Sequence, residues 1–368
     1  MSDCREIACC RPPAAGDKRY NFPSVRCDRQ NLLDTRLQQL EQWLTTLGYD
    51  DYQLEPASAD ASFRRYFRIR HAGASFIVMD APPEQEDTGP FIRVARLLAD
   101  AGLHVPQIQA HDSEQGFLQL SDLGSRLYLS VLDAQRVEPL YADALAALLR
   151  LQQHPAPDWL SDYDRSLLLQ EMQLFAHWYL QRHLGLELDA QQLTVLQESF
   201  EHLAGVALAQ PRVIVHRDYH SRNLLLSDPN PGVIDFQDAV VGPVTYDPVS
   251  LLRDCYIGWP RAQVEQWLRD YHHQAQQAGI LDQRIDAGQF QRWFDLMGVQ
   301  RHLKASGIFA RLNYRDAKPG YLADIPRTLG YVLEVMVDYP ELAAFAQLLH
   351  DLRLPQRLEE IHPREVPA

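Results

Sequence analysis

The chain has 368 residues, of which 46% are apolar and 23% charged, a composition typical of an ordinary globular protein. Lys and Arg number 35 against 49 Asp and Glu, and the resulting net charge of −14 disfavours binding to nucleic acid. Apolar runs such as 167–169 are far too short to span a membrane, and no apolar signal segment opens the chain. We therefore expect a cytoplasmic protein without nucleic-acid or membrane partners.

The N-terminal segment 1–31 is expected to be a disordered tail outside the fold. It holds Cys4, Cys9, Cys10 and Cys27, whereas Cys255 stands alone in the body of the chain. This distribution provides no disulfide framework. A zinc site in the tail is the alternative, but the adjacent Cys9 and Cys10 do not form the C-x-x-C pair that such sites use.

A first lobe is predicted over residues 32–122. An amphipathic helix begins at Asp34 and ends at Gly48, and a second helix begins at Pro90 and ends at Gly102. Runs rich in aromatic and β-branched residues predict five strands, the first three of them antiparallel. These strands are expected at 52–57, 62–71, 74–81, 105–112 and 116–123.

The second predicted lobe, residues 123–368, is mostly helical. Helices are expected at 140–153, 166–184, 189–203, 248–256, 262–278 and in a long run from Gln289. Three short β-type runs, 212–216, 223–227 and 231–236, interrupt them. A β-rich lobe followed by a helical lobe predicts the α+β class with a two-lobed architecture.

Several common catalytic motifs are absent from the sequence. There is no G-x-G-x-x-G, no phosphate-binding P-loop, no G-x-S-x-G and no H-E-x-x-H. Lysine occurs only at positions 18, 304 and 318, so the first lobe contains none. Any phosphate held by that lobe must therefore be bound by arginine or by backbone amides.

Three polar residues at the ends of the short β runs predict phosphoryl transfer. Asp218 and Asn223 form an H-R-D-x-x-x-x-N pattern, and Asp235 follows the next β run in the sequence I-D-F. Asp218 can orient and deprotonate an attacking hydroxyl, while Asn223 and Asp235 can hold Mg²⁺ on the phosphates.

These residues have two other interpretations. Asp, Asn and His near strand ends are often turn formers with no catalytic role. His216 and Asp218 also form half of the 2-His-1-carboxylate triad of non-haem iron sites. An iron site, however, would leave Asn223 and Asp235 without a role, and it would need strands where the sequence predicts helices.

The segments HRDYHSRN and VIDFQD resemble the aminoglycoside phosphotransferase and choline kinase superfamily, which has a protein-kinase-like fold. The segments ASFRRYFRIR, FLQLSDLG and LMGVQRHLKASGIFARL are similar to bacterial kinases that phosphorylate N-acetylmuramate and N-acetylglucosamine at the anomeric hydroxyl during peptidoglycan recycling. The resemblance, which covers the chain from about residue 32, implies ATP and Mg²⁺ as cofactors and a monomer that binds an amino sugar. An aminoglycoside, choline or homoserine kinase and a non-catalytic pseudokinase are the alternatives.

The sequence departs from this superfamily on the third strand, where a lysine should hold the α- and β-phosphates. Met79 or Asp80 occupies that place. We expect Arg64, Arg65 and Arg68 to substitute for the lysine, because guanidinium groups bind phosphate through two parallel hydrogen bonds.

The remaining site residues are assigned from the same resemblance or, for the sugar-binding candidates, because they follow the catalytic elements or lie on the long helix facing them. Gln119, Leu120 and Ser121 are expected in the hinge that meets adenine. His216 is expected to be structural, and Asp247 to be an N-cap and a buried anchor of the catalytic loop. The candidates for sugar binding are His220, Arg222, Asp238 and Arg301.

Overall fold

The computed structural model describes residues 26–59 and 63–361, and it describes side chains over 35–57 and 63–358. The chain divides into two compact units, 1–51 and 52–368. In the first unit, helix α1 (Arg26–Thr46) starts well before Asp34, so the predicted helix start is wrong. The residues preceding Asp34 include no Pro or Gly between 26 and 33, and nothing in them interrupts a helix. Most of the predicted tail, with Cys4, Cys9 and Cys10, lies outside the described residues.

The first lobe of the second unit contains a five-stranded antiparallel sheet with strand order β1-β2-β3-β5-β4. All five strands occur where the sequence predicts them. They are β1 (Gln53–Ala59), β2 (Arg65–His71), β3 (Ala74–Asp80), β4 (Ile108–Asp112) and β5 (Phe117–Ser121).

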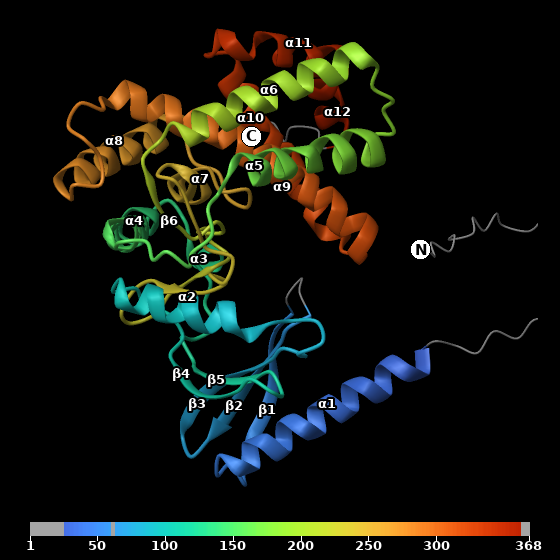
Figure 1. The fold of residues 1–368 in the computed structure, drawn as a ribbon, viewed down its shortest axis with the longest axis vertical. Coiled ribbons are helices and arrows are strands. Elements are labelled where there is room, and N and C mark those ends of the chain that lie inside the picture. The colour runs from blue at the N-terminus through green and yellow to red at the C-terminus, as the bar shows by residue number, and fades with distance from the viewer. Residues whose placement is uncertain (1–25, 60–62, 362–368) are drawn as a thin grey trace, which may run out of the picture. The chain divides into compact units, whose positions relative to one another are not determined.

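Helix α2 (Thr88–Asp100) lies between this sheet and the second lobe (Figure 1). It begins earlier than predicted, because the side chain of Asp87 caps it by accepting a hydrogen bond from the Gly89 amide at 2.8 Å. Pro90 therefore falls in the first turn, where its missing N–H costs nothing.

The second lobe is helical, as expected. Its helices in the described part of the chain are α3 (Tyr128–Val131), α4 (Val137–Gln153), α5 (Arg165–Leu174), η1 (Phe175–His183), α6 (Ala190–Leu208), α7 (Tyr246–Leu252), α8 (Arg261–Gln277), α9 (Ala287–Asp316), η2 (Pro319–Asp324), α10 (Ile325–Met336), η3 (Pro340–Leu342), α11 (Ala343–Asp351) and α12 (Leu354–Ile361). The predicted helix 166–184 changes to π-helical pitch at Phe175. The region after α9 is divided into short helices, with Pro319 and Pro340 opening two of them.

The short β runs form two ribbons instead of one group. Strand β6 (Arg212–Val215) pairs with β9 (Val240–Pro243), which was not among the predicted strands, and β7 (Leu224–Leu225) pairs with β8 (Gly232–Val233). The loop after β6 and the loop after β8 carry the three residues of the predicted phosphoryl-transfer motif.

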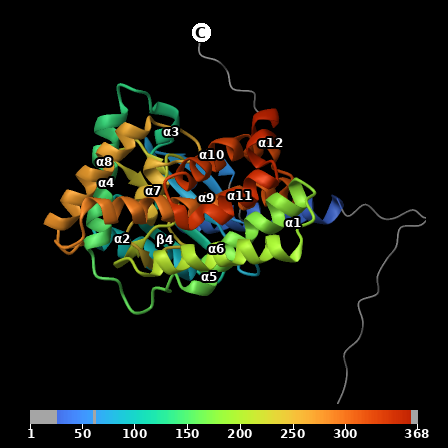
Figure 2. The same cartoon turned by 90° about the horizontal axis from the view of Figure 1, so that it is seen from above.

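The long helix α9 forms the centre of the second lobe and contacts α5, η1, α6, α7 and α10 (Figure 2). At Gly307 the backbones of α9 and α5 approach so closely that a Cβ atom there would lie 2.3 Å from the carbonyl carbon of Leu174. Glycine is therefore required at this crossing. None of the helices in the described ranges combines the length and the apolar character that crossing a bilayer needs.

Candidate active site

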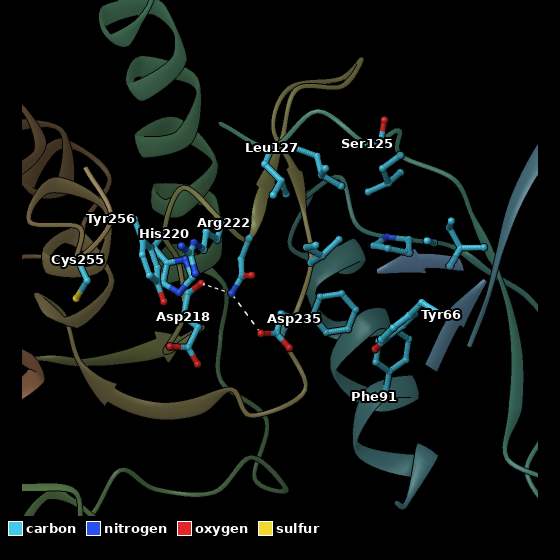
Figure 3. Close-up of a pocket in the computed structure, with 18 of the residues that line it drawn as sticks. Tyr66, Phe91, Ser125, Leu127, Asp218, His220, Arg222, Asp235, Cys255 and Tyr256 are labelled. Carbon is cyan, nitrogen blue, oxygen red and sulfur yellow. Dashed lines mark hydrogen bonds between the residues drawn. The ribbon is translucent and has the colours of Figure 1, made fainter. Parts of the chain in front are cut away.

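A cavity of about 550 Å³ lies between the sheet and the helical lobe (Figure 3). Tyr66, Ile77 and Leu120 line it from the first lobe, and Asp218 and Asp235 line it from the second. The cavity therefore joins the nucleotide side predicted for the first lobe to the motif loops of the second.

The loop that carries Asp218 is held in shape by Asp247. The fully buried carboxylate of Asp247 accepts hydrogen bonds from the backbone amides of His216, at 2.7 Å, and Arg217, at 3.0 Å. Burial raises the pKa of Asp247 to about 7, against the effect of these two amides. Arg217 has a positive φ of 76°, an unusual conformation that the anchor maintains. Asp247 is the predicted anchor, but the N-cap position of α7 belongs to Thr245.

The side chain of His216 also holds this loop in shape. Its Nδ1 atom accepts a hydrogen bond from the Asp218 amide at 3.3 Å, and its Nε2 atom lies 3.2 Å from the Ile234 carbonyl oxygen. Burial lowers the pKa of His216 to about 4, so the imidazole is neutral. Both ring nitrogens are engaged, and the described residues contain no group of three His, Cys, Asp or Glu placed to hold a metal. These contacts agree with a structural His216 and not with an iron ligand.

Asn223 connects the two motif loops. Its Nδ2 atom donates to the Asp218 carbonyl oxygen at 3.0 Å and to Oδ2 of Asp235 at 3.3 Å (Figure 3). With the amide nitrogen committed, the side-chain oxygen is the atom of Asn223 that can ligate a cation. One carboxylate and one amide oxygen fit Mg²⁺, which is usually held by few protein ligands together with substrate phosphates.

Asp218 is surrounded by positive charge. Burial by itself would raise the pKa of this carboxyl, but Lys304, His220, Arg301 and Arg217 lower it to about 2. The carboxylate is therefore ionised throughout the neutral pH range. It can accept a hydrogen bond from a substrate hydroxyl, and as a weak base it suits an acceptor hydroxyl that is itself acidic.

Lys304 was not predicted as a site residue. It lines the cavity from α9, and its Nζ atom contacts Oε1 of Glu171 at 2.9 Å and the Tyr246 hydroxyl at 3.0 Å. Glu171 also pairs with Arg217, next to Asp218. The one available sign was its rarity, because Lys304 is the only lysine between residues 19 and 317.

The small-lobe arginines are each paired with an acid. Arg64 contacts Glu86 at 3.0 Å, Arg65 pairs with Asp80, and Arg68 contacts Asp122 at 2.7 Å. Arg65 and Asp80 are direct cross-strand neighbours. Of the three arginines, only Arg68 lines the cavity. A phosphate-binding role for them remains a prediction.

The predicted hinge and sugar residues also differ in whether they line the cavity. Leu120 and Ser121 line the cavity, while the buried Gln119 donates from Nε2 to Oε1 of Gln109 at 2.9 Å instead. His220, Arg222 and Arg301 line the cavity beside Asp218. Asp238 is exposed and does not line the cavity, and its carbonyl oxygen accepts a bond from Arg217 at 3.3 Å.

The profile of the phosphotransferase enzyme family matches residues 53–283. The chain belongs to this family and is a phosphotransferase, as the sequence motifs predicted.

Among known proteins, an N-acetylmuramate/N-acetylglucosamine kinase from Pseudomonas putida is 50% identical over 336 residues, covering 88% of this chain and 98% of that protein. A kinase of the same name from Neisseria meningitidis serogroup B is 42% identical, covering 87% of this chain and 97% of that protein. Among solved structures, a choline kinase from Streptococcus pneumoniae aligns with a TM-score of 0.56 at 12% identity, covering 82% of this chain and 99% of that one. An ADP-bound aminoglycoside phosphotransferase aligns with a TM-score of 0.54 at 16% identity, covering 81% and 97%. The predicted two-lobed, protein-kinase-like fold is confirmed.

Proposed function

We propose that this phosphotransferase uses ATP to phosphorylate the anomeric C1 hydroxyl of N-acetylmuramate, N-acetylglucosamine or both, giving the sugar 1-phosphate for peptidoglycan recycling. The main support is the similarity, at 42% to 50% identity over nearly their full length, to kinases named for these two sugars. We also propose that it acts in the cytoplasm, where ATP is available. A monomeric state stays a prediction.

The arrangement of Asp218, Asn223 and Asp235 supports a direct transfer. Asp218 accepts the proton of the C1 hydroxyl while the hydroxyl oxygen attacks the γ-phosphorus of ATP, and ADP leaves. Mg²⁺ bound by Asn223 and Asp235 would offset the charge of the phosphates. Because a hemiacetal hydroxyl is more acidic than an ordinary alcohol, positioning and charge neutralisation can carry more of the work than the basicity of Asp218, whose pKa is lowered to about 2.

The charges around the acceptor favour a sugar over the substrates of other kinases with this fold. Arg222, Arg301 and Lys304 line the cavity near Asp218. Aminoglycosides and choline are cations, and three nearby positive side chains would repel them. A neutral or anionic acceptor fits this end of the cavity.

The Arg65–Asp80 pair, which occupies the place of the expected lysine, favours one alternative, a nucleotide-binding pseudokinase. Purified protein with ATP, Mg²⁺ and each sugar labelled with ¹³C at C1 distinguishes the two. Phosphorus NMR should show a new resonance coupled to C1, absent with Asp218→Asn. ATP binding without any sugar phosphate would favour the pseudokinase, and phosphate on another hydroxyl would contradict the anomeric assignment.

The metal assignment has its own test. Asp235→Ala removes a carboxylate ligand and should raise the Mg²⁺ concentration needed for half-maximal rate, with weaker ATP binding. Glu84→Ala, at an exposed residue outside the cavity lining, is the control. An unchanged Mg²⁺ dependence of the Asp235 variant would show that this carboxylate does not hold the metal.

A further inference from the structure

Arg222 is a rigid guanidinium on the acceptor side of the cavity. Its Cζ atom lies 3.7 Å from the centre of the Tyr256 ring (Figure 3). The same atom lies 5.4 Å from the centre of the Tyr321 ring. Stacking of this kind holds the planar group in one orientation and leaves the N–H edge available. The side chain is 37% exposed although it lines the cavity, so a bound molecule can reach it.

The guanidinium of Arg222 has few partners among the described residues. Its nearest acid is Asp324, at 3.9 Å, a distance beyond hydrogen bonding, and no described residue accepts a hydrogen bond from the Arg222 side chain. The neighbouring cations differ. Lys304 is bonded to Glu171, and Arg301 is buried against Cys255 with a sulfur contact of 3.6 Å. Arg222 is thus the accessible cation among the three.

Arg222 also lies close to the reacting group. It belongs to the same tight turn as Asp218, in which the His220 amide donates to the Asp218 carbonyl oxygen at 3.0 Å and the Asn223 amide to the His220 carbonyl oxygen at 2.8 Å. A sugar whose C1 hydroxyl meets Asp218 therefore has its other ring substituents within the neighbourhood of Arg222. The surrounding aromatic wall of Tyr256, Phe309 and Tyr321 offers flat surfaces for the apolar face of such a ring.

We propose that Arg222 binds a carboxylate of the acceptor sugar and makes the enzyme selective for an acidic sugar. This inference rests on the proposed function. N-acetylmuramate carries a lactyl carboxylate that N-acetylglucosamine lacks, and a guanidinium fork pairs with a carboxylate through two parallel hydrogen bonds. Arg222 is then the specificity-determining residue of the acceptor site.

The test varies the charge on both partners. The wild-type enzyme and Arg222→Gln are each assayed with N-acetylmuramate and with its methyl ester, which keeps the bulk of the side chain and removes the charge. We expect wild type to prefer the acid over the ester in kcat/KM by about 10- to 100-fold, as for a charge-assisted pair. In Arg222→Gln the preference should fall to about one, and Arg222→Lys should restore part of it.

Arg182→Gln is the matched control, because Arg182 also lies over a tyrosine ring, that of Tyr314 at 5.4 Å, but does not line the cavity. It should keep the wild-type preference. If Arg222→Gln retains the acid preference, or loses activity equally with acid and ester while its thermal unfolding is unchanged, the inference is wrong. If Arg222→Gln does not fold, Arg222→Lys and the salt dependence of KM for the acid decide, since a charge pair weakens as salt rises. A wild-type enzyme that phosphorylates neither amino sugar would instead contradict the proposed function itself.

Discussion

The sheet of the first lobe and the proposed acceptor end of the cavity, beside Asp218, differ in how their positively charged side chains are paired with acids. In the sheet region every arginine from Arg64 to Arg70 has a carboxylate partner within 3.0 Å. The pairs are Arg64–Glu86, Arg65–Asp80, Arg68–Asp122 and Arg70–Glu55. At the acceptor end, Arg222 has its nearest acid at 3.9 Å and Arg301 has no carboxylate within ion-pair distance among the described residues.

This difference distinguishes charges that hold the fold from charges that are available to a ligand. A buried cation without a close acid costs stability, because its desolvation is not compensated. Beside Asp218, the more distant charges of Asp218 and Asp254 offset the burial of Arg301, and Arg222 is 37% exposed. In the sheet region each guanidinium has a carboxylate partner, on a neighbouring strand for Arg65 and Arg70 and in a loop for Arg64 and Arg68.

Removing the acid that the acceptor-end cations surround should have the largest effect. Asp218→Asn keeps the shape of the side chain but cannot accept a proton, so kcat should fall by roughly 10² to 10⁴. ATP affinity, measured by calorimetry, should be retained. A near-normal kcat would show that Asp218 is not the proton acceptor.

The buried ion pairs beside the loop that carries Asp218 can be broken at Glu171. Glu171→Gln leaves Lys304 and Arg217 without their shared carboxylate, and we expect a loss of about 3 to 5 kcal/mol in the free energy of unfolding measured with urea. The control is Glu201→Gln, in an exposed pair with Arg165, which should cost no more than about 1 kcal/mol. Equal losses of unfolding free energy in the two variants would show that the buried pairs are no more stabilising than the exposed pair.

The positive charge of Arg301 beside His302 should also affect how the stability of the protein depends on pH. Burial and then the charge of Arg301 lower the pKa of His302 to about 3, from about 6.5 in an unfolded chain. Between these values the unfolded chain binds a proton that the folded protein excludes. This histidine should therefore make stability fall as pH drops from 6.5 towards 3, by up to about 1.4 kcal/mol per pH unit.

Urea unfolding at a series of pH values measures this slope. His302→Asn should reduce it, whereas His350→Asn, at an exposed position, should leave it unchanged. The same slope in all three proteins would mean that His302 does not titrate as described. His216, with a pKa of about 4, keeps part of the slope in every variant.

The smallest effect is expected in the sheet. Arg64→Ala should raise the KM for ATP more than the KM for the sugar, but by no more than about tenfold, because its guanidinium is already bonded to Glu86. Arg70→Ala, in an exposed pair with Glu55, is the control. An ATP KM within twofold of wild type together with a raised sugar KM would assign Arg64 to the acceptor side.

The parts of the site that are close in sequence were predictable, and the parts assembled from distant segments were not. Asp218 and Asn223 share one loop, so their spacing already predicted that they lie close together. The partner of Lys304, by contrast, is Glu171 on another helix, and that of Arg68 is Asp122, 54 residues away. Local patterns of polarity reveal strands and helices but not which side chains meet across them. Strand β9 was not predicted for the same reason, because its short apolar run forms a strand by pairing with the distant β6.

The close approach of α9 to α5 at Gly307 limits how the enzyme can change its choice of substrate during evolution. With the backbones in contact at Gly307, α9 cannot move closer to α5. The residues it presents to the cavity, Arg301, Lys304, Ala305, Ile308, Phe309 and Leu312, recur at the three- and four-residue intervals of a single helical face. New acceptor preferences can therefore arise by exchanging side chains along this face one at a time, except Lys304, whose pair with Glu171 stabilises the fold. A library restricted to the other positions is the direct route to engineering them.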